Sequence, residues 1–163
     1  MVRPHSAVLV MEEPSDADKP LMLKDFLAEP ILTRMSRQLL AEGVQRFFLV
    51  CSPPQAQEAR ACLPPDMEVI LSDRQQDLMA FLNTPDPVLV LNRSAIPAAQ
   101  AGPGFVYAAP GYELQEAWRE RMTNNVQGAE PVAGWLPVYG PATIAELEPL
   151  FREGRDTVPG ASI

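Results

Sequence analysis

Four short runs of apolar residues, separated by longer mixed segments, predict four buried strands in the first hundred residues. They lie at residues 7–11, 46–51, 67–71 and 87–92. Each run is almost continuously apolar instead of alternating, which is typical of strands that are covered on both faces of a sheet.

The segments between these runs carry apolar residues at helical spacing. They predict helices over residues 31–42, 54–62 and 74–82, with Gly43 as the residue that ends the first. Strands that alternate with helices indicate βαβ units and a parallel sheet with right-handed crossovers. In the topology that we expect, the first strand lies between the second and the fourth.

The last third of the chain has a looser pattern. It predicts a strand at 105–108, a helix at 113–122, a short strand around Trp135 and a helix at 143–152. In the last helix we expect Thr143 as the N-cap and Glu146 as its capping-box partner, and Pro149 should shorten or kink the helix. We expect Trp118, Trp135, Tyr107 and Tyr112 to pack these elements together.

Length and composition predict one α/β domain over residues 1–153, followed by a loose tail over 154–163. We expect a Rossmann-like open sheet, mainly parallel and flanked by helices, because 163 residues suffice for one core. The net charge of −8 argues against nucleic acid or an anionic membrane as partners. With two cysteines, no signal-peptide pattern and no long apolar run, the chain is predicted to be cytoplasmic.

The loop after the first apolar run has the position of a phosphate-binding loop without its composition. Such a loop needs glycines, so that backbone N–H groups can approach the anion. No glycine precedes Gly43. The loop instead carries four carboxylates and one lysine: Glu12, Glu13, Asp16, Asp18 and Lys19. Their spacing fits no EF-hand, so a solvated acidic loop is favoured over a metal site.

Four motifs in the first fifty residues nevertheless follow a known order. The opening strand precedes K-P-L-M at 19–22, E-P-I-L at 29–32 and E-G-V at 42–44. Together they resemble the sugar-phosphate nucleotidyltransferase family, nearest to the N-terminal domain of bacterial N-acetylglucosamine-1-phosphate uridylyltransferase. That family has K-P-L-L, G-K-P-M/I-L and A-G-V at these places. The resemblance implies a nucleotide-diphospho-sugar transferase-like fold and a nucleotide or nucleotide sugar as ligand.

The chain departs from this family at the residues that carry its chemistry. The family's G-x-G-T-R-M loop, with its triphosphate cradle and catalytic arginine, is absent. The fourth strand, which in the family ends in Gly-Asp and holds Mg²⁺, is followed here by Asn92, Arg93 and Ser94. An asparagine amide or a serine hydroxyl cannot replace a carboxylate as the main ligand of a hard cation. Only 66 residues follow Pro97 to build the sugar side of a pocket.

These departures favour a degenerate domain that acts as a non-catalytic binding or interaction module, with a protein partner or a second copy as further candidates. The alternative is an active nucleotidyltransferase that transfers a nucleotidyl group from an NTP to a sugar 1-phosphate, and only this alternative requires Mg²⁺. We assign no catalytic residue. The expected ligand-binding residues are Lys19, Gln75, Asn92, Arg93 and Ser94. The plain alternative for Lys19 and Arg93 is that both are solvated surface charges.

Cys51 ends the second strand, at the edge where open α/β sheets bind ligands. A nucleophilic thiol needs a base or a lowered pKa. The one histidine, His5, precedes the first strand and should lie at the opposite edge. The pattern therefore favours Cys51 as a small apolar filler.

Overall fold

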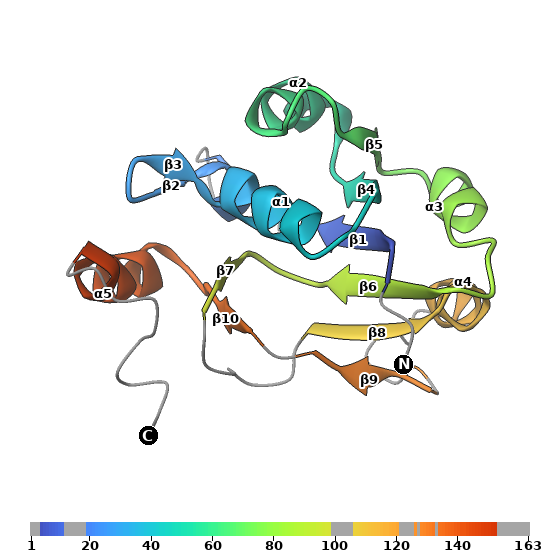
Figure 1. Cartoon of the computed structure of the whole chain (residues 1–163). Helices are drawn as coiled ribbons and strands as arrows, with labels where there is room; N and C mark the ends of the chain where they lie inside the picture. The colour runs from blue at the N-terminus through green and yellow to red at the C-terminus, as the bar shows by residue number, and fades with distance from the viewer. Residues whose placement is uncertain are drawn as a thin grey trace.

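A six-stranded sheet forms the centre of the protein, and its strand order is β5-β4-β1-β6-β8-β9 (Figure 1). The computed structural model describes residues 4–11, 19–98, 106–120, 126, 128–132 and 134–152. The strands are β1 (Ser6–Val10), β4 (Arg46–Val50), β5 (Glu68–Ser72), β6 (Pro87–Leu91), β8 (Val106–Pro110) and β9 (Glu130–Pro131). The first four are parallel neighbours, and β8 and β9 are antiparallel. The expected position of β1 between the second and fourth strands is confirmed.

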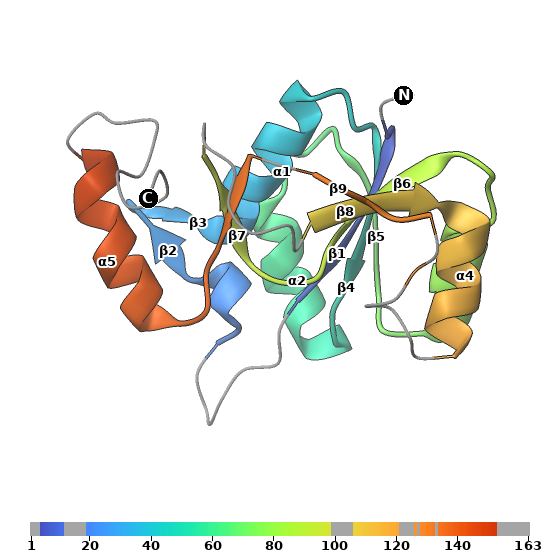
Figure 2. The ribbon, with the colours of Figure 1, turned by 90° about the horizontal axis from the view of Figure 1, so that it is seen from below.

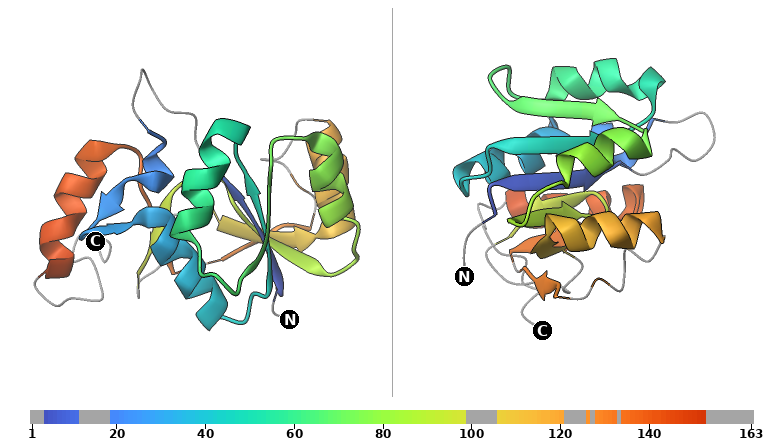
Figure 3. Two further views of the ribbon diagram at one scale, coloured as in Figure 1. Left: turned by 90° about the horizontal axis from the view of Figure 1, so that it is seen from above. Right: turned by 90° about the vertical axis from the view of Figure 1, so that its right-hand side faces the viewer.

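Helices cover both faces of this sheet, which gives an α/β fold. The helices are α1 (Ile31–Ala41), α2 (Pro53–Cys62), α3 (Gln75–Phe81), α4 (Gly111–Arg119) and α5 (Pro141–Arg152), and the first four cover the sheet. Figures 2 and 3 show α1 and α2 on one face and α3 and α4 on the other. The chain therefore reverses its direction of winding after β5, as predicted. None of the helices within the described residues has the length and apolar character to cross a membrane.

The alternation of side chains along β1 explains why its sequence is apolar throughout. Ala7 and Leu9 join the core beneath α1 and α2, and Val8 joins the core beneath α3 and α4. All three are at most 1% exposed. The third apolar run, residues 67–71, was also expected to be covered on both faces, and this is wrong. It forms β5 at the edge of the sheet, where Glu68 and Ile70 are exposed.

Helix α1 follows its predicted pattern closely. Ile31, Met35 and Leu39 recur at intervals of four and are fully buried. The helix ends at Ala41, Gly43 follows its C-cap with a φ of +98°, and the N–H of Val44 donates to the carbonyl of Leu39 at 3.0 Å. Glycine reaches this φ without the steric cost that a Cβ imposes.

Replacement of Gly43 by alanine should therefore lower the free energy of unfolding by about 1–2 kcal/mol. No atom lies within 4 Å of the position of an added Cβ, so the cost is conformational and involves no clash. Urea denaturation measures it. Gly43→Asn is the matched variant, and it should lose less because asparagine tolerates this region better. Equal losses for the two variants would contradict the conformational explanation.

The last helix ends at Arg152 as predicted, but it begins two residues earlier than expected. Helix α5 begins at Pro141 and not after Thr143, because proline suits the first helical position. The Thr143 hydroxyl accepts the N–H of Tyr139 at 3.3 Å and lies inside the first turn. The helix also continues through Pro149 to Arg152, since Phe151 packs edge-on against Phe26 with ring centroids 5.4 Å apart.

Several short elements build a second layer beside the sheet, and most were not predicted. They are η1 (Leu21–Leu23), the hairpin of β2 (Asp25–Phe26) and β3 (Glu29–Pro30), and the pair of β7 (Ala95–Pro97) with β10 (Trp135–Pro137). Figure 2 shows α5 beside the β2–β3 hairpin. The strand at Trp135 was expected, and its side chain is 2% exposed. Trp118 and Tyr107 pack on the core beneath α3 and α4, but Tyr112 is 51% exposed, contrary to expectation.

Candidate functional site

The carboxyl ends of β1, β4, β5 and β6 meet at one edge of the sheet because these strands are parallel. The sequence predicts a ligand-binding site at this edge. The predicted residues spread along it and do not converge. Gln75 begins α3 after β5, and two strands separate β5 from β6. At about 4.8 Å per strand, β5 and β6 are about 14 Å apart. Gln75 thus lies apart from Asn92, Arg93 and Ser94.

Lys19 lies beside α2, on the face of the sheet opposite to α3, which Gln75 begins. Its Nζ is 3.8 Å from a carboxylate oxygen of Glu58 on α2, and the two side chains are 51% and 55% exposed. An exposed pair of this kind contributes little to stability. The acidic residues Glu12, Glu13, Asp16 and Asp18 lie outside the described residues.

The residues after β6 are tied to the C-terminal third of the chain. The carbonyl of Ser94, a fully buried residue, accepts the N–H of Val138 at 3.0 Å. Burial raises the pKa of the Tyr107 hydroxyl, and a hydrogen bond with the Asn92 side chain opposes this shift. Asn92 and Ser94 therefore have structural partners.

Arg93 is half-buried and lies against an exposed aromatic ring. Its guanidinium carbon lies 4.6 Å from the ring centroid of Tyr139, which is 65% exposed. No carboxylate forms an ion pair with Arg93 within the described residues. Sequence reasoning missed Tyr139, whose only local signal is its position just before the Gly-Pro that begins α5. The pair joins a cation to an aromatic face.

Cys51 and His5 lie far apart, as expected. His5 precedes β1 and bonds through Nδ1 to the carbonyl of Gly43 at 3.3 Å. From the register of β1 and β4, Cys51 lies six residues further along, about 20 Å away. Burial, and secondarily the charge of Asp73, raise the pKa of the Cys51 thiol. A raised pKa opposes formation of the reactive thiolate.

A groove of about 520 Å³ lies elsewhere, along α1 and not at the strand ends. Its walls come from β2, α1, β7, the residue before β10 and α5. Arg34, Arg37 and Gln38 supply polar groups, and Phe26, Ile96 and Phe151 supply apolar ones. None of the ligand-binding residues predicted from the sequence lines this groove.

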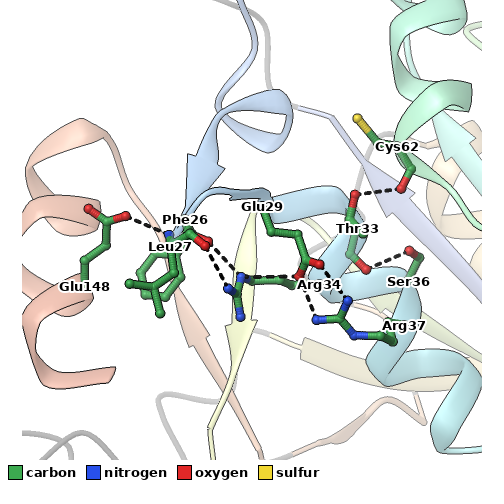
Figure 4. Close-up of polar contacts among 9 residues, drawn as sticks. All are labelled: Phe26, Leu27, Glu29, Thr33, Arg34, Ser36, Arg37, Cys62 and Glu148. Atoms are coloured by element: carbon green, nitrogen blue, oxygen red, sulfur yellow. Dashed lines mark hydrogen bonds and ion pairs between the residues drawn. The ribbon is translucent and has the colours of Figure 1, made fainter. Parts of the chain in front are cut away.

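Figure 4 shows the polar contacts that shape the wall of the groove. Arg37 donates two hydrogen bonds, of 2.7 and 2.6 Å, to the carboxylate of Glu29, and this lowers the pKa of Glu29. Arg34 donates through Nε to the carbonyl of Phe26 at 2.9 Å. Glu148 on α5 accepts the N–H of Leu27 at 2.7 Å. The β2–β3 turn is thus held between α1 and α5.

The described residues include no group of three or more His, Cys, Asp or Glu side chains placed to hold a metal ion.

Comparisons with known proteins find a partial likeness to a solved structure. No family model matches the chain, and no curated protein matches it. Among solved structures, the chain is similar to the inositol-1-phosphate CTP transferase from T. maritima, with a TM-score of 0.44 and 12% identity. The match covers 58% of this chain and 45% of that one, so the chain spans less than half the length of that structure. A likeness of this extent carries no argument about activity.

Proposed function

We propose that this chain is a degenerate nucleotidyltransferase-like domain that binds an anionic ligand, of the class of a nucleotide or nucleotide sugar, without transferring a nucleotidyl group. Two findings support a retained crevice. The four ordered motifs resemble the sugar-phosphate nucleotidyltransferases, and the winding reverses beside β1. Open α/β sheets bind ligands at such a reversal.

The observation that carries the binding role is the pairing of Arg93 with Tyr139 at the end of β6. A guanidinium binds phosphate or carboxylate oxygens through its planar fork. An exposed aromatic face beside it can stack on a planar ring. The pair therefore suits a ligand that combines an anionic group with a ring.

Three features support the loss of transfer. The first loop has no glycine to form a triphosphate cradle. Asn92 and Ser94 replace the family's metal-binding aspartate region, and both have structural bonds. The carboxylates around Lys19 would oppose the charge of a triphosphate. Phosphoryl chemistry needs positive charge around the phosphates.

We expect UDP-N-acetylglucosamine to raise the melting temperature, UTP to raise it less because the carboxylates near Lys19 oppose its triphosphate, and Arg93→Ala to weaken the shift. A ligand at 100 times its Kd should stabilise the protein by about 2.7 kcal/mol. The matched control is Arg119→Ala, an exposed arginine at the end of α4. Arg37→Ala tests the groove along α1 instead. No shift with either nucleotide, or a shift that depends on Arg37 and not on Arg93, would refute the proposed site.

We expect no turnover when the protein is given UTP, N-acetylglucosamine 1-phosphate and Mg²⁺. Release of pyrophosphate measures the reaction directly. A full-length N-acetylglucosamine-1-phosphate uridylyltransferase in the same assay is the positive control. A rate on the order of 1 per second or above would establish the active alternative and overturn the proposal of a non-catalytic domain.

A further inference from the structure

Strand β5 forms one edge of the main sheet, and among the described residues its outer side has no strand partner. Its burial pattern also differs from that of the inner strands. Glu68 and Ile70 are exposed, and Ile70, at 43% exposure, is one of four large apolar side chains that are exposed within the described residues. An open edge of this kind presents unpaired N–H and C=O groups to another strand.

The hydrogen bonds to β4 show which backbone groups face outward. The carbonyl of Ser72 accepts the N–H of Cys51, which follows β4, at 3.2 Å. Backbone groups alternate in direction along a strand, so those of Ile70 also point toward β4. The N–H and C=O groups of Val69 and Leu71 therefore point to the open side.

This alternation selects one arrangement for a second copy of β5. If two β5 strands pair antiparallel around Ile70, Val69 of each copy lies opposite Leu71 of the other. Those residues exchange N–H···O=C bonds, which are the bonds that the open groups can make. Ile70 then faces Ile70 of the second copy in a non-hydrogen-bonded pair, where side chains come closest.

The charges flanking β5 favour the same arrangement. Asp66 precedes the strand, Arg74 follows it, and both are exposed. Asp66 lies in the turn before β5, and Arg74, which follows Asp73, is the N-cap of α3. Antiparallel pairing centred on Ile70 brings the end of each β5 that carries Asp66 and Glu68 beside the end of the other that carries Arg74. A parallel arrangement in register would instead place Glu68 beside Glu68.

We propose that two copies of this chain associate through antiparallel pairing of their β5 strands, with Ile70 on the two-fold axis and the end that carries Asp66 beside the end of the other copy that carries Arg74. The two sheets then form one continuous sheet. This inference is independent of the ligand proposed at the end of β6, because β5 lies at the opposite side of β1. The paired segment is short, so we expect a weak dimer that forms only at high protein concentration.

A cysteine at position 70 tests the register. Non-hydrogen-bonded antiparallel pairs bring Cα atoms to about 4.5 Å, within the range that a disulfide spans. Ile70→Cys should form a covalent dimer under mild oxidation. Glu68→Cys is the matched control, because its two copies would be four residues out of register, about 13 Å apart. Wild type reports any background from Cys51 and Cys62. Equal crosslinking of both variants, or crosslinking of Glu68→Cys alone, would overturn the proposed register.

Sedimentation velocity from low micromolar to near-millimolar concentration tests the association itself. Ile70→Lys should raise the dissociation constant at least about tenfold. Arg74→Asp should also weaken the dimer, and Asp66→Arg combined with Arg74→Asp should restore it at least in part. Circular dichroism checks that each variant is folded. A wild-type chain that is monomeric at every concentration, or a dimer that Ile70→Lys leaves unchanged, would overturn the proposal.

Discussion

Replacement of Gly111 by alanine should destabilise the protein by about 3 kcal/mol or more. Gly111 begins α4, where the helix meets the turn that leads into β6. A Cβ at this position would collide with the backbone carbonyl of Leu82, and it would lie 2.6 Å from the carbonyl oxygen of Thr84. Backbone atoms cannot move aside as a flexible side chain can, so the turn or the helix must shift.

The same turn satisfies the first donors of α4, which makes a shift more costly. The N–H of Gly111 donates to the carbonyl of Asp86 at 3.0 Å, and the N–H of Tyr112 donates to that of Thr84 at 3.1 Å. A displaced helix would lose both bonds. Urea denaturation gives the change in the free energy of unfolding.

Gly140→Ala is the matched control for this prediction. Gly140 also lies at the start of a helix, but nothing lies within 4 Å of its added Cβ. Its cost should stay below about 1 kcal/mol. A similar loss for both variants would show that the close approach at Gly111 is not the cause.

The sheet and the first three helices could be predicted because their signals are local. Each inner strand is apolar on both faces, and α1 repeats its buried residues at intervals of four. The exposed face of β5 could not be foreseen from its own residues. Val69, Ile70 and Leu71 are apolar like those of the inner strands, and only the position of β5 at the edge exposes Ile70.

The turn between β2 and β3 had no local signal. Leu27 and Ala28 have φ of 53° and 64°, values for which a hairpin normally uses asparagine or glycine. Contacts from distant residues hold the turn instead. Glu148, which accepts the N–H of Leu27, lies 121 positions away in the sequence. Propensity at residues 27 and 28 cannot report a contact supplied by α5.

Distant contacts also shape the candidate site, and local sequence patterns do not report them. The order of the strands places Lys19, Gln75 and Arg93 near one edge, but only the finished sheet shows that β4 and β1 separate Gln75 from Arg93. Tyr139, which contacts Arg93, lies in the connection between β10 and α5, more than forty residues further along the chain. The groove along α1 likewise joins Arg34 to Phe151, and no short pattern relates residues so far apart.

Truncation of Phe26 to alanine should destabilise the protein by about 3–5 kcal/mol. Phe26 is fully buried at the end of β2, where the hairpin, α1 and α5 meet. Its ring contacts Phe151 edge-on, and the guanidinium carbon of Arg34 lies 5.4 Å from its centroid. The substitution leaves a cavity and removes both contacts. Urea denaturation followed by circular dichroism measures the loss.

Phe151→Ala removes the same ring pair from the α5 side and provides the matched control. Phe151 is only partly buried, so this variant should lose less than Phe26→Ala. The double variant should lose less than the two single losses combined, by about 0.5–1.5 kcal/mol, because either truncation alone removes the shared contact. Additive losses would mean that the two rings do not stabilise each other. In that case, Glu148 and its bond to Leu27 would be the main attachment of α5 to the hairpin.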